Sequence, residues 1–164
     1  MIKRAAEARG GGIRALLLVI LVATGCRTLP PLPPANLSEP GWTVRQGQAV
    51  WQSGKERPEI AGEILLATKA NGEAFIQFTK TPFPLVIAQQ ATNHWQVQFP
   101  TENKSYSGLG TPPSRLISFP LAEALAGRVF PDKWSWHQDA NGWLLENRST
   151  KERLEGYFTP SGVP

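Results

Sequence analysis

Cysteine and histidine are scarce in this sequence, whose 164 residues include one cysteine, Cys26, and two histidines, His94 and His137. A lone cysteine closes no disulfide within its own chain, so we expect stability to come from an ordinary hydrophobic core. The histidines lack cysteine partners and the HExxH spacing of a zinc site. The sequence also has no G-x-S-x-G, P-loop or dinucleotide-binding glycine pattern. These absences predict a protein that is not an enzyme and uses no cofactor and no metal ion.

Long apolar runs are also missing, because the longest extends only over residues 15–23. A helix rises about 1.5 Å per residue and needs about 20 residues to cross a bilayer core of roughly 30 Å, so this run is too short to span it. Four basic residues and one acidic residue precede the run. A basic start followed by a short apolar run predicts a secretory signal peptide in residues 1–25 that is cleaved.

The apolar run leads into LVATGC, residues 21–26, which resembles a bacterial lipobox. In a lipobox the cysteine sulfur receives diacylglycerol, with acyl chains such as palmitate, and the signal peptide is cut just before it. The usual pattern prefers Leu where Ala23 stands. We expect Cys26 to be the lipidated first residue, anchored lastingly by two acyl chains. The alternative, a small buried residue in an uncleaved anchor, is disfavoured by the short apolar run.

Without the predicted signal peptide, the chain has almost no excess of basic over acidic residues. Cleavage before Cys26 removes four of the 17 Lys and Arg residues and one of the 13 Asp and Glu residues, which leaves 13 against 12. The remaining charges of both signs are scattered, whereas a nucleic-acid binder would keep a basic stripe on its folded domain. We therefore expect no nucleic-acid partner, and a membrane contact made through Cys26.

The mature chain divides by composition into a linker and one domain. Residues 28–40 hold five prolines in thirteen positions and no apolar periodicity, which favours an extended, semi-rigid segment. We expect residues 26–40 to be the lipidated cysteine and a proline-rich linker, and residues 41–164 to be a single domain.

Strand patterns dominate that domain. Asn71-Gly72 and Asn141-Gly142 each separate two strand-like segments, which indicates hairpins, and we expect a type I′ turn at such a pair. Helix signals are confined to residues 118–130, where Pro120 favours a helix start and Gly127 a stop. Residues 101–113 read as a long polar loop. The expected strands cover residues 41–53, 59–70, 73–80, 86–91, 95–99, 133–140, 143–150 and 151–158.

The pattern predicts a mainly β (α+β) fold, in which a curved antiparallel sheet or incomplete barrel has one or two short helices on its concave side. Six tryptophans and seven phenylalanines are many for such a domain. Trp134 and Trp136 share a strand face, and Trp143 can pair with one of them across the hairpin. These aromatics either fill a closed core or line a cavity for a hydrophobic ligand. The candidate ligand-binding residues are Trp95, Trp134, Trp136, Trp143 and Leu125.

Phe83 lies in TPFP, residues 81–84, between two strand-like segments. Held on a stiff turn, its ring would form a tip that touches a membrane or a partner. The alternative is that Phe83 folds back onto the core.

The order of these segments resembles the lipoprotein-localisation carrier and its outer-membrane receptor (LolA/LolB-like). The resemblance covers residues 41–160 and rests on GWTVRQGQAVW, GEILLATKANGEAFIQFTK, PLAEALAG and the closing tryptophan-rich strands. It implies an incomplete barrel that holds acyl chains of other lipoproteins on its concave face, and Cys26 favours the anchored receptor type. By position, Phe83 would belong to the protruding loop that helps insert the cargo. Among bacterial lipoproteins, Arg27 in place of aspartate points to the outer membrane.

We therefore expect a monomeric bacterial lipoprotein of the cell envelope, anchored at the periplasmic face of the outer membrane, that binds acyl chains or another hydrophobic ligand. The resemblance implies a lipoprotein cargo and a role in lipoprotein localisation. The alternative is a non-catalytic structural or assembly lipoprotein that presents a sheet edge or the loop 101–113 to a protein partner. A continuous apolar cleft between sheet and helix would favour the first function, and a filled core the second.

Overall fold

The computed structural model describes residues 29–128 and 132–159. The predictions for the signal peptide and for Cys26 lie outside these residues. The chain divides into two units, Met1–Pro30 and Pro31–Pro164, and the fold described below belongs to the second.

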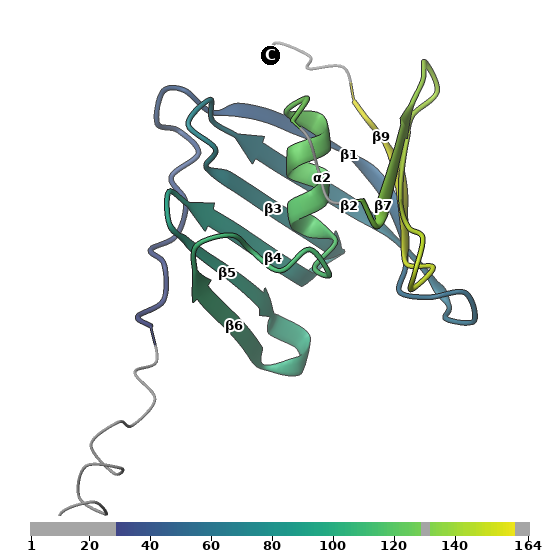
Figure 1. The fold of residues 1–164 in the computed structure, drawn as a ribbon, viewed down its shortest axis with the longest axis horizontal. Helices are drawn as coiled ribbons and strands as arrows, with labels where there is room; N and C mark the ends of the chain where they lie inside the picture. The colour runs from purple at the N-terminus through teal and green to yellow at the C-terminus, as the bar shows by residue number, and fades with distance from the viewer. Residues whose placement is uncertain (1–28, 129–131, 160–164) are drawn as a thin grey trace, which may run out of the picture. The chain divides into compact units, whose positions relative to one another are not determined.

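In the described residues, a single antiparallel sheet of nine strands makes up most of this unit, in the order β6-β5-β4-β3-β2-β1-β9-β8-β7 (Figure 1). The mainly β, antiparallel prediction is confirmed. The sheet is not closed, because β6 and β7 stand at the two ends of the order without pairing to each other. The strands are β1 (Thr43–Gln52), β2 (Glu59–Thr68), β3 (Ala74–Lys80), β4 (Phe83–Ala91), β5 (His94–Phe99), β6 (Lys104–Leu109), β7 (Trp134–Gln138), β8 (Trp143–Asn147) and β9 (Arg153–Phe158).

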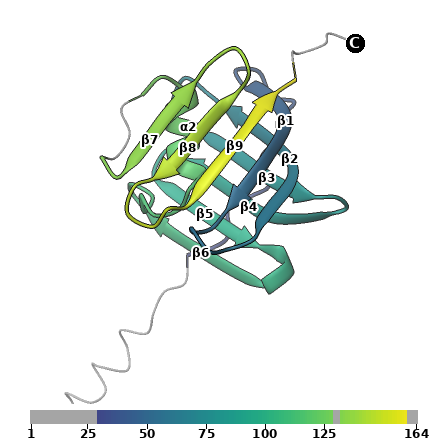
Figure 2. The ribbon, with the colours of Figure 1, turned by 90° about the vertical axis from the view of Figure 1, so that its right-hand side faces the viewer.

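The sheet is bent, and one short helix, α2 (Ser118–Leu125), lies against the side toward which it bends (Figures 1 and 2). We call the side covered by α2 the inner face and the opposite side the outer face. As predicted, Pro120 lies in the first helical turn, and Gly127, with a φ of +67°, follows the helix end. Glycine adopts this left-handed conformation without steric cost, which ends the helix.

Glycine also permits a close approach of strands where the sheet bends. A Cβ atom built on Gly156 in β9 would lie 2.2 Å from the carbonyl oxygen of Gln48 in β1. No side chain fits there, so β1 and β9 pack backbone to backbone at this point. This contact joins the two parts of the sheet, β1–β6 and β7–β9, into one bent surface.

The hairpin at Asn71-Gly72 forms where it is predicted, but its turn is not type I′. Gly72 has a φ of +93°, whereas Asn71 does not have a positive φ. The Lys69 amide donates to the Glu73 carbonyl over 2.9 Å, and the Gly72 amide donates to the Lys69 carbonyl over 3.1 Å. The connection is therefore a longer loop with its left-handed residue at the glycine alone.

The second Asn-Gly hairpin, between β7 and β8, is also not type I′, since neither Asn141 nor Gly142 has a positive φ. Here Oδ1 of Asp139 accepts hydrogen bonds from the amides of Asn141 (2.7 Å) and Gly142 (3.1 Å). The aspartate side chain organises the turn in place of left-handed backbone.

The predicted loop at residues 101–113 is wrong in its first part. A 3-10 turn, Pro100–Glu102, reverses the chain, and β6 then pairs with β5 along its whole length, from Phe99 opposite Lys104 to His94 opposite Leu109. Five of the six β6 residues are exposed. The segment is therefore kept in a strand conformation by its hydrogen-bonded pairing with β5 and not by burial of its side chains.

The core lies between α2 and the inner face. Leu121 of α2 is fully buried, and Phe119 is 3% exposed. They pack against buried residues that alternate along the strands, as a half-buried sheet requires. The buried strand residues of this cluster are Ala49, Ile64, Leu66, Ala74, Ile76, Phe78, Val86, Ala88, Val97, Trp134, Trp143, Leu145 and Leu154.

Residues 31–40, which we call the N-terminal strap, lie on the outer face. The Leu32 amide donates to Oε1 of Gln96 over 2.7 Å, and Nε2 of Gln89 donates to the Pro33 carbonyl over 2.9 Å. Gln96 is only 6% exposed, and its Nε2 donates to Oγ of Ser105. This part of the expected linker is therefore held against the domain and does not extend away from it as a spacer.

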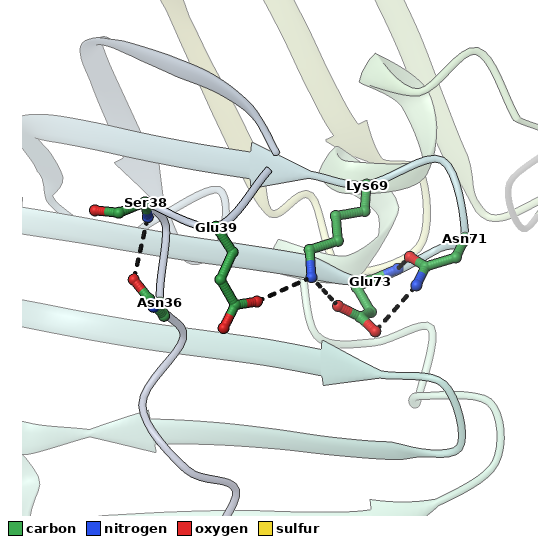
Figure 3. Close-up of polar contacts among 6 residues, drawn as sticks. All are labelled: Asn36, Ser38, Glu39, Lys69, Asn71 and Glu73. Atoms are coloured by element: carbon green, nitrogen blue, oxygen red, sulfur yellow. Dashed lines mark hydrogen bonds and ion pairs between the residues drawn. The ribbon is translucent and has the colours of Figure 1, made fainter. Parts of the chain in front are cut away.

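The strap is held a second time at its C-terminal end, where Glu39 and Glu73 both point toward Lys69 (Figure 3). The Lys69 ammonium lies 3.5 Å from Oε2 of Glu39 and 2.9 Å from Oε2 of Glu73. It also lies 4.7 Å from the centre of the Trp42 ring, a cation–π arrangement. Its hydrogen bond to Glu73 is the main cause that lowers the pKa of that carboxyl.

Candidate ligand cleft on the inner face

The tryptophans of β7 and β8 lie together on the inner face, as the strand pattern predicts. Trp136 stacks on Trp143 with ring centres 5.9 Å apart, and Trp143 stacks on Phe158 of β9 at 5.5 Å. The Arg45 guanidinium of β1 lies 5.9 Å from the centre of the Phe158 ring and ends the row. The row thus crosses β7, β8, β9 and β1 and ties this part of the sheet together.

Two of these tryptophans belong to the core. Trp134 is 3% exposed and Trp143 is 4% exposed, and Nε1 of Trp134 donates to the Ser114 carbonyl. Trp136 and Leu125 are half-buried and pack against the same core. All five predicted ligand-binding residues therefore belong to this core or pack against it, and Trp134 and Trp143 are closed off from solvent.

Trp95 lies elsewhere, on the inner face of β5. Its ring meets Phe119 of α2 edge to face, with centres 6.2 Å apart. Beside it a cleft of about 380 Å³ opens between the β5–β6 hairpin and the segment that leads into α2. We call this the inner cleft. It is lined by Trp95, Phe99, Glu102, Lys104, Tyr106, Pro113, Arg115 and Leu116.

The walls of the inner cleft are mostly apolar. Phe99 and Tyr106 meet edge to face at 6.2 Å, and Leu116 and Pro113 face them from the segment before α2. The volume lies toward the lower end of the roughly 300–1,000 Å³ of small-molecule sites. An apolar chain would therefore fit in part, with its remainder left outside.

Charge is confined to the rim of the inner cleft. The Lys104 ammonium lies 2.7 Å from Oε2 of Glu102, and this hydrogen bond raises the pKa of Lys104. Arg115 is exposed, and no ion pair ties it to another of the described residues. Because Lys104 is already neutralised by its partner, Arg115 supplies the free positive charge at the mouth.

In the middle of the inner face, Leu121 and Phe119 of α2 pack against the strands. The inner cleft lies at the β5–β6 end of the sheet, and none of the residues of α2 lines it.

Sequence reasoning missed most of the residues that line this cleft. Tyr106 was placed in a loop, whereas Tyr106 pairs with Val97 and so faces inward beside Trp95. No local signal marks this strand, because Lys104, Tyr106 and Gly108 share one face and neither face of β6 is consistently apolar.

Phe83 begins β4 directly after the β3–β4 turn, where it pairs with Lys80. Its side chain is 64% exposed. Phe83 therefore does not fold back onto the core, and its contact with a membrane or a partner stays a prediction.

Metal and membrane-spanning features are absent from the described residues. They contain no group of three or more His, Cys, Asp and Glu side chains placed to hold a metal ion. None of their helices combines the length and apolar character needed to cross a bilayer. A comparison with models of known protein families and with curated proteins finds no match to this chain.

Proposed function

We propose that this protein binds an acyl chain, or a similar hydrophobic ligand with an anionic head, in the inner cleft. The observation that carries the proposal is an aromatic cleft on the inner face with Arg115, which no ion pair ties to another described residue, at its mouth. Burial of apolar surface stabilises a bound chain by about 25 cal/mol per Å². A guanidinium suits a carboxylate or phosphate head because it donates two parallel hydrogen bonds.

The ligand would meet the protein at a membrane of the bacterial cell envelope. We propose that Cys26 carries the lipid anchor at the periplasmic face of the outer membrane. The resemblance to the lipoprotein-localisation receptor makes the acyl chains of a lipoprotein the natural cargo. The exposed ring of Phe83 would then touch the membrane surface when cargo is delivered. The lipobox pattern at residues 21–26 supports the anchor.

The binding site can be tested with a photoactivatable fatty acid added to membranes that contain the full chain. We expect saturable cross-links in the peptides that hold Trp95, Tyr106 and Leu116. Tyr106→Asp, which puts a charge into the apolar wall, should lower the yield at least about fivefold. Leu109→Asp is the matched control, because Leu109 is also exposed (62% against 50% for Tyr106) but faces the opposite side of β6.

Arg115→Gln separates the head-group contact from the apolar contact. We expect it to weaken binding of the fatty acid but not of the corresponding neutral alcohol. If cross-links are absent, or if Tyr106→Asp and Leu109→Asp behave alike, the inner cleft is not the binding site.

The anchor has an independent test in Cys26→Ser. This variant should lose labelling by a lipid precursor and remain as the uncleaved form. A processed, membrane-bound Cys26→Ser protein would contradict the lipobox interpretation without bearing on the cleft.

The alternative function, presentation of a sheet edge to a partner, has two observations in its favour. The first is that Leu121 and Phe119 are packed into the core between α2 and the sheet, and the second is an exposed sheet edge. β6 ends the strand order, and five of its six residues are exposed. Edge strands recruit further strands through their free backbone groups. Absence of lipid cross-links, combined with protein cross-links from a photoactivatable residue at Ser107, would favour this second function.

A further inference from the structure

The outer face carries a second hollow, far along the strand order from the inner cleft. It has a volume of about 440 Å³ and lies over β1, β8 and β9, next to the β7–β8 turn. We call it the outer groove. Ala49 faces the core, so its neighbours Gln48 and Val50 point outward, as does Tyr157 beside Gly156. Of the predicted ligand-binding residues, Trp143 alone is among the described residues that line this groove, and the proposed function does not account for the groove.

The floor of the outer groove is apolar. It is formed by Val50, Ala61 and Leu144, from three different strands. The Tyr157 ring stands at the groove and is 53% exposed. A tyrosine this exposed can offer a flat apolar ring with a hydroxyl at its end.

The carboxylates at the groove are already engaged. Oε2 of Glu155 accepts from the Arg153 guanidinium over 2.6 Å. Oδ1 of Asp139 accepts from two backbone amides of the turn, and its Oδ2 lies 3.8 Å from Nε2 of His137. The Arg153 guanidinium offsets the charge of Glu155, whereas Asp139 keeps its negative charge, so the groove attracts cations weakly and disfavours anions.

The remaining polar groups at the rim are uncharged. The amides of Gln48 and Asn141 and the hydroxyl of Tyr157 are exposed and line the groove. Each amide offers both a donor and an acceptor, and the hydroxyl offers one donor and two lone pairs. Such groups can pair with neighbouring hydroxyls, which also both donate and accept.

We propose that the outer groove binds a neutral carbohydrate. A sugar ring has one face made of C–H groups, which packs on the Tyr157 ring and the apolar floor. Its edge of hydroxyl groups can hydrogen-bond with the amides of Gln48 and Asn141. An acyl chain would gain no hydrogen bonds from these exposed amides, whereas a sugar would. An anionic ligand would approach Glu155 and Asp139.

The test uses the full chain in lipid nanodiscs and saturation-transfer NMR with soluble sugars. The probes are the trisaccharides of N-acetylglucosamine, of α-1,4-linked glucose and of β-1,4-linked glucose, together with galacturonic acid trimer as an anionic comparison. We expect saturable transfer to the C–H protons of at least one neutral probe and weaker transfer to the anionic one. Absence of saturable binding to all neutral probes would overturn the proposal.

Four variants locate the site. Tyr157→Ala should weaken binding about tenfold or more, whereas Tyr157→Phe, which keeps the ring, should stay within about threefold. Ala61→Phe fills the floor at an exposed position and should abolish binding. Leu109→Ala, on β6, should bind as the unchanged protein does. Binding that survives both Tyr157→Ala and Ala61→Phe would overturn the proposal. The fatty-acid cross-links of the inner cleft are unaffected in either case.

Discussion

Trp95 lies across Gly108, the residue directly opposite it in the pairing of β5 with β6. A Cβ atom on Gly108 would lie 2.6 Å from the nearest atom of the Trp95 indole. The indole therefore rests on the bare backbone of β6, and it also meets the ring of Phe119 in α2. This arrangement sets one wall of the inner cleft.

Gly108→Ala is expected to push the Trp95 indole toward the cleft. The added methyl group displaces a large ring, so we expect a loss of about 1–3 kcal/mol in the free energy of unfolding and weaker fatty-acid cross-linking. Urea unfolding followed by tryptophan fluorescence measures the first effect. Ser107→Ala, at the neighbouring exposed position, is the control. Equal stability and equal cross-linking in both variants would contradict the contact.

The hairpins could be predicted because their signals are local. Asn71-Gly72 and Asn141-Gly142 mark chain reversals between alternating segments, and the sheet pairs there. The turn type could not be predicted from the pair alone. At the first hairpin only the glycine is left-handed, and at the second the Asp139 carboxylate holds the turn.

The inner cleft could not be predicted, because its walls come from segments far apart in the chain. β6 is mostly exposed, and only its pairing with β5 makes it a strand. Leu116 and Arg115 reach the cleft from the segment before α2, whose position depends on the packing of the helix. Strand alternation predicts that Trp134 and Trp136 share a face. It does not predict that Trp134 is closed off from solvent, because that depends on how the helix packs.

Gly156→Ala is expected to destabilise the whole sheet, because its Cβ would lie 2.2 Å from the Gln48 carbonyl oxygen. Backbone cannot move aside as a flexible side chain does, so we expect a loss of about 3 kcal/mol or more in the free energy of unfolding. Gly54→Ala is the control, since its Cβ would meet nothing closer than 3.7 Å. A Gly156→Ala protein that unfolds at the same urea concentration as Gly54→Ala would refute the close approach.

Gln96→Leu is expected to release the start of the N-terminal strap. The variant removes the acceptor of the Leu32 amide and the donor to Ser105, at a cost of about 1–3 kcal/mol. Hydrogen exchange followed by mass spectrometry should show faster exchange in the peptide that contains Leu32. Gln98→Leu, two residues along β5, is the control and should leave that exchange rate unchanged. Unchanged exchange in Gln96→Leu would mean that the strap is held by its other contacts.

The ionisation of Glu152 makes the stability of the domain depend on pH, and the sign of this dependence follows from the direction of its pKa shift. Burial raises the pKa of this carboxyl above 4.5, against the smaller effect of the Trp51 indole, which donates to Oε1 over 3.0 Å. Because the folded state holds the proton more tightly than the unfolded chain, this contribution to stability is present below about pH 4.5 and is lost as pH rises through the folded pKa.

Glu152→Gln keeps an acceptor for Trp51 and carries no charge at any pH. We expect a higher free energy of unfolding than in the unchanged protein at pH 7 and nearly the same value at pH 4, where the unchanged carboxyl is protonated in the fold. Urea unfolding at both pH values measures this difference. Glu56→Gln, at an exposed position of the β1–β2 connection, should show no such gain at pH 7. If Glu152→Gln raised the free energy of unfolding equally at both pH values, the gain would not come from the titration of this carboxyl.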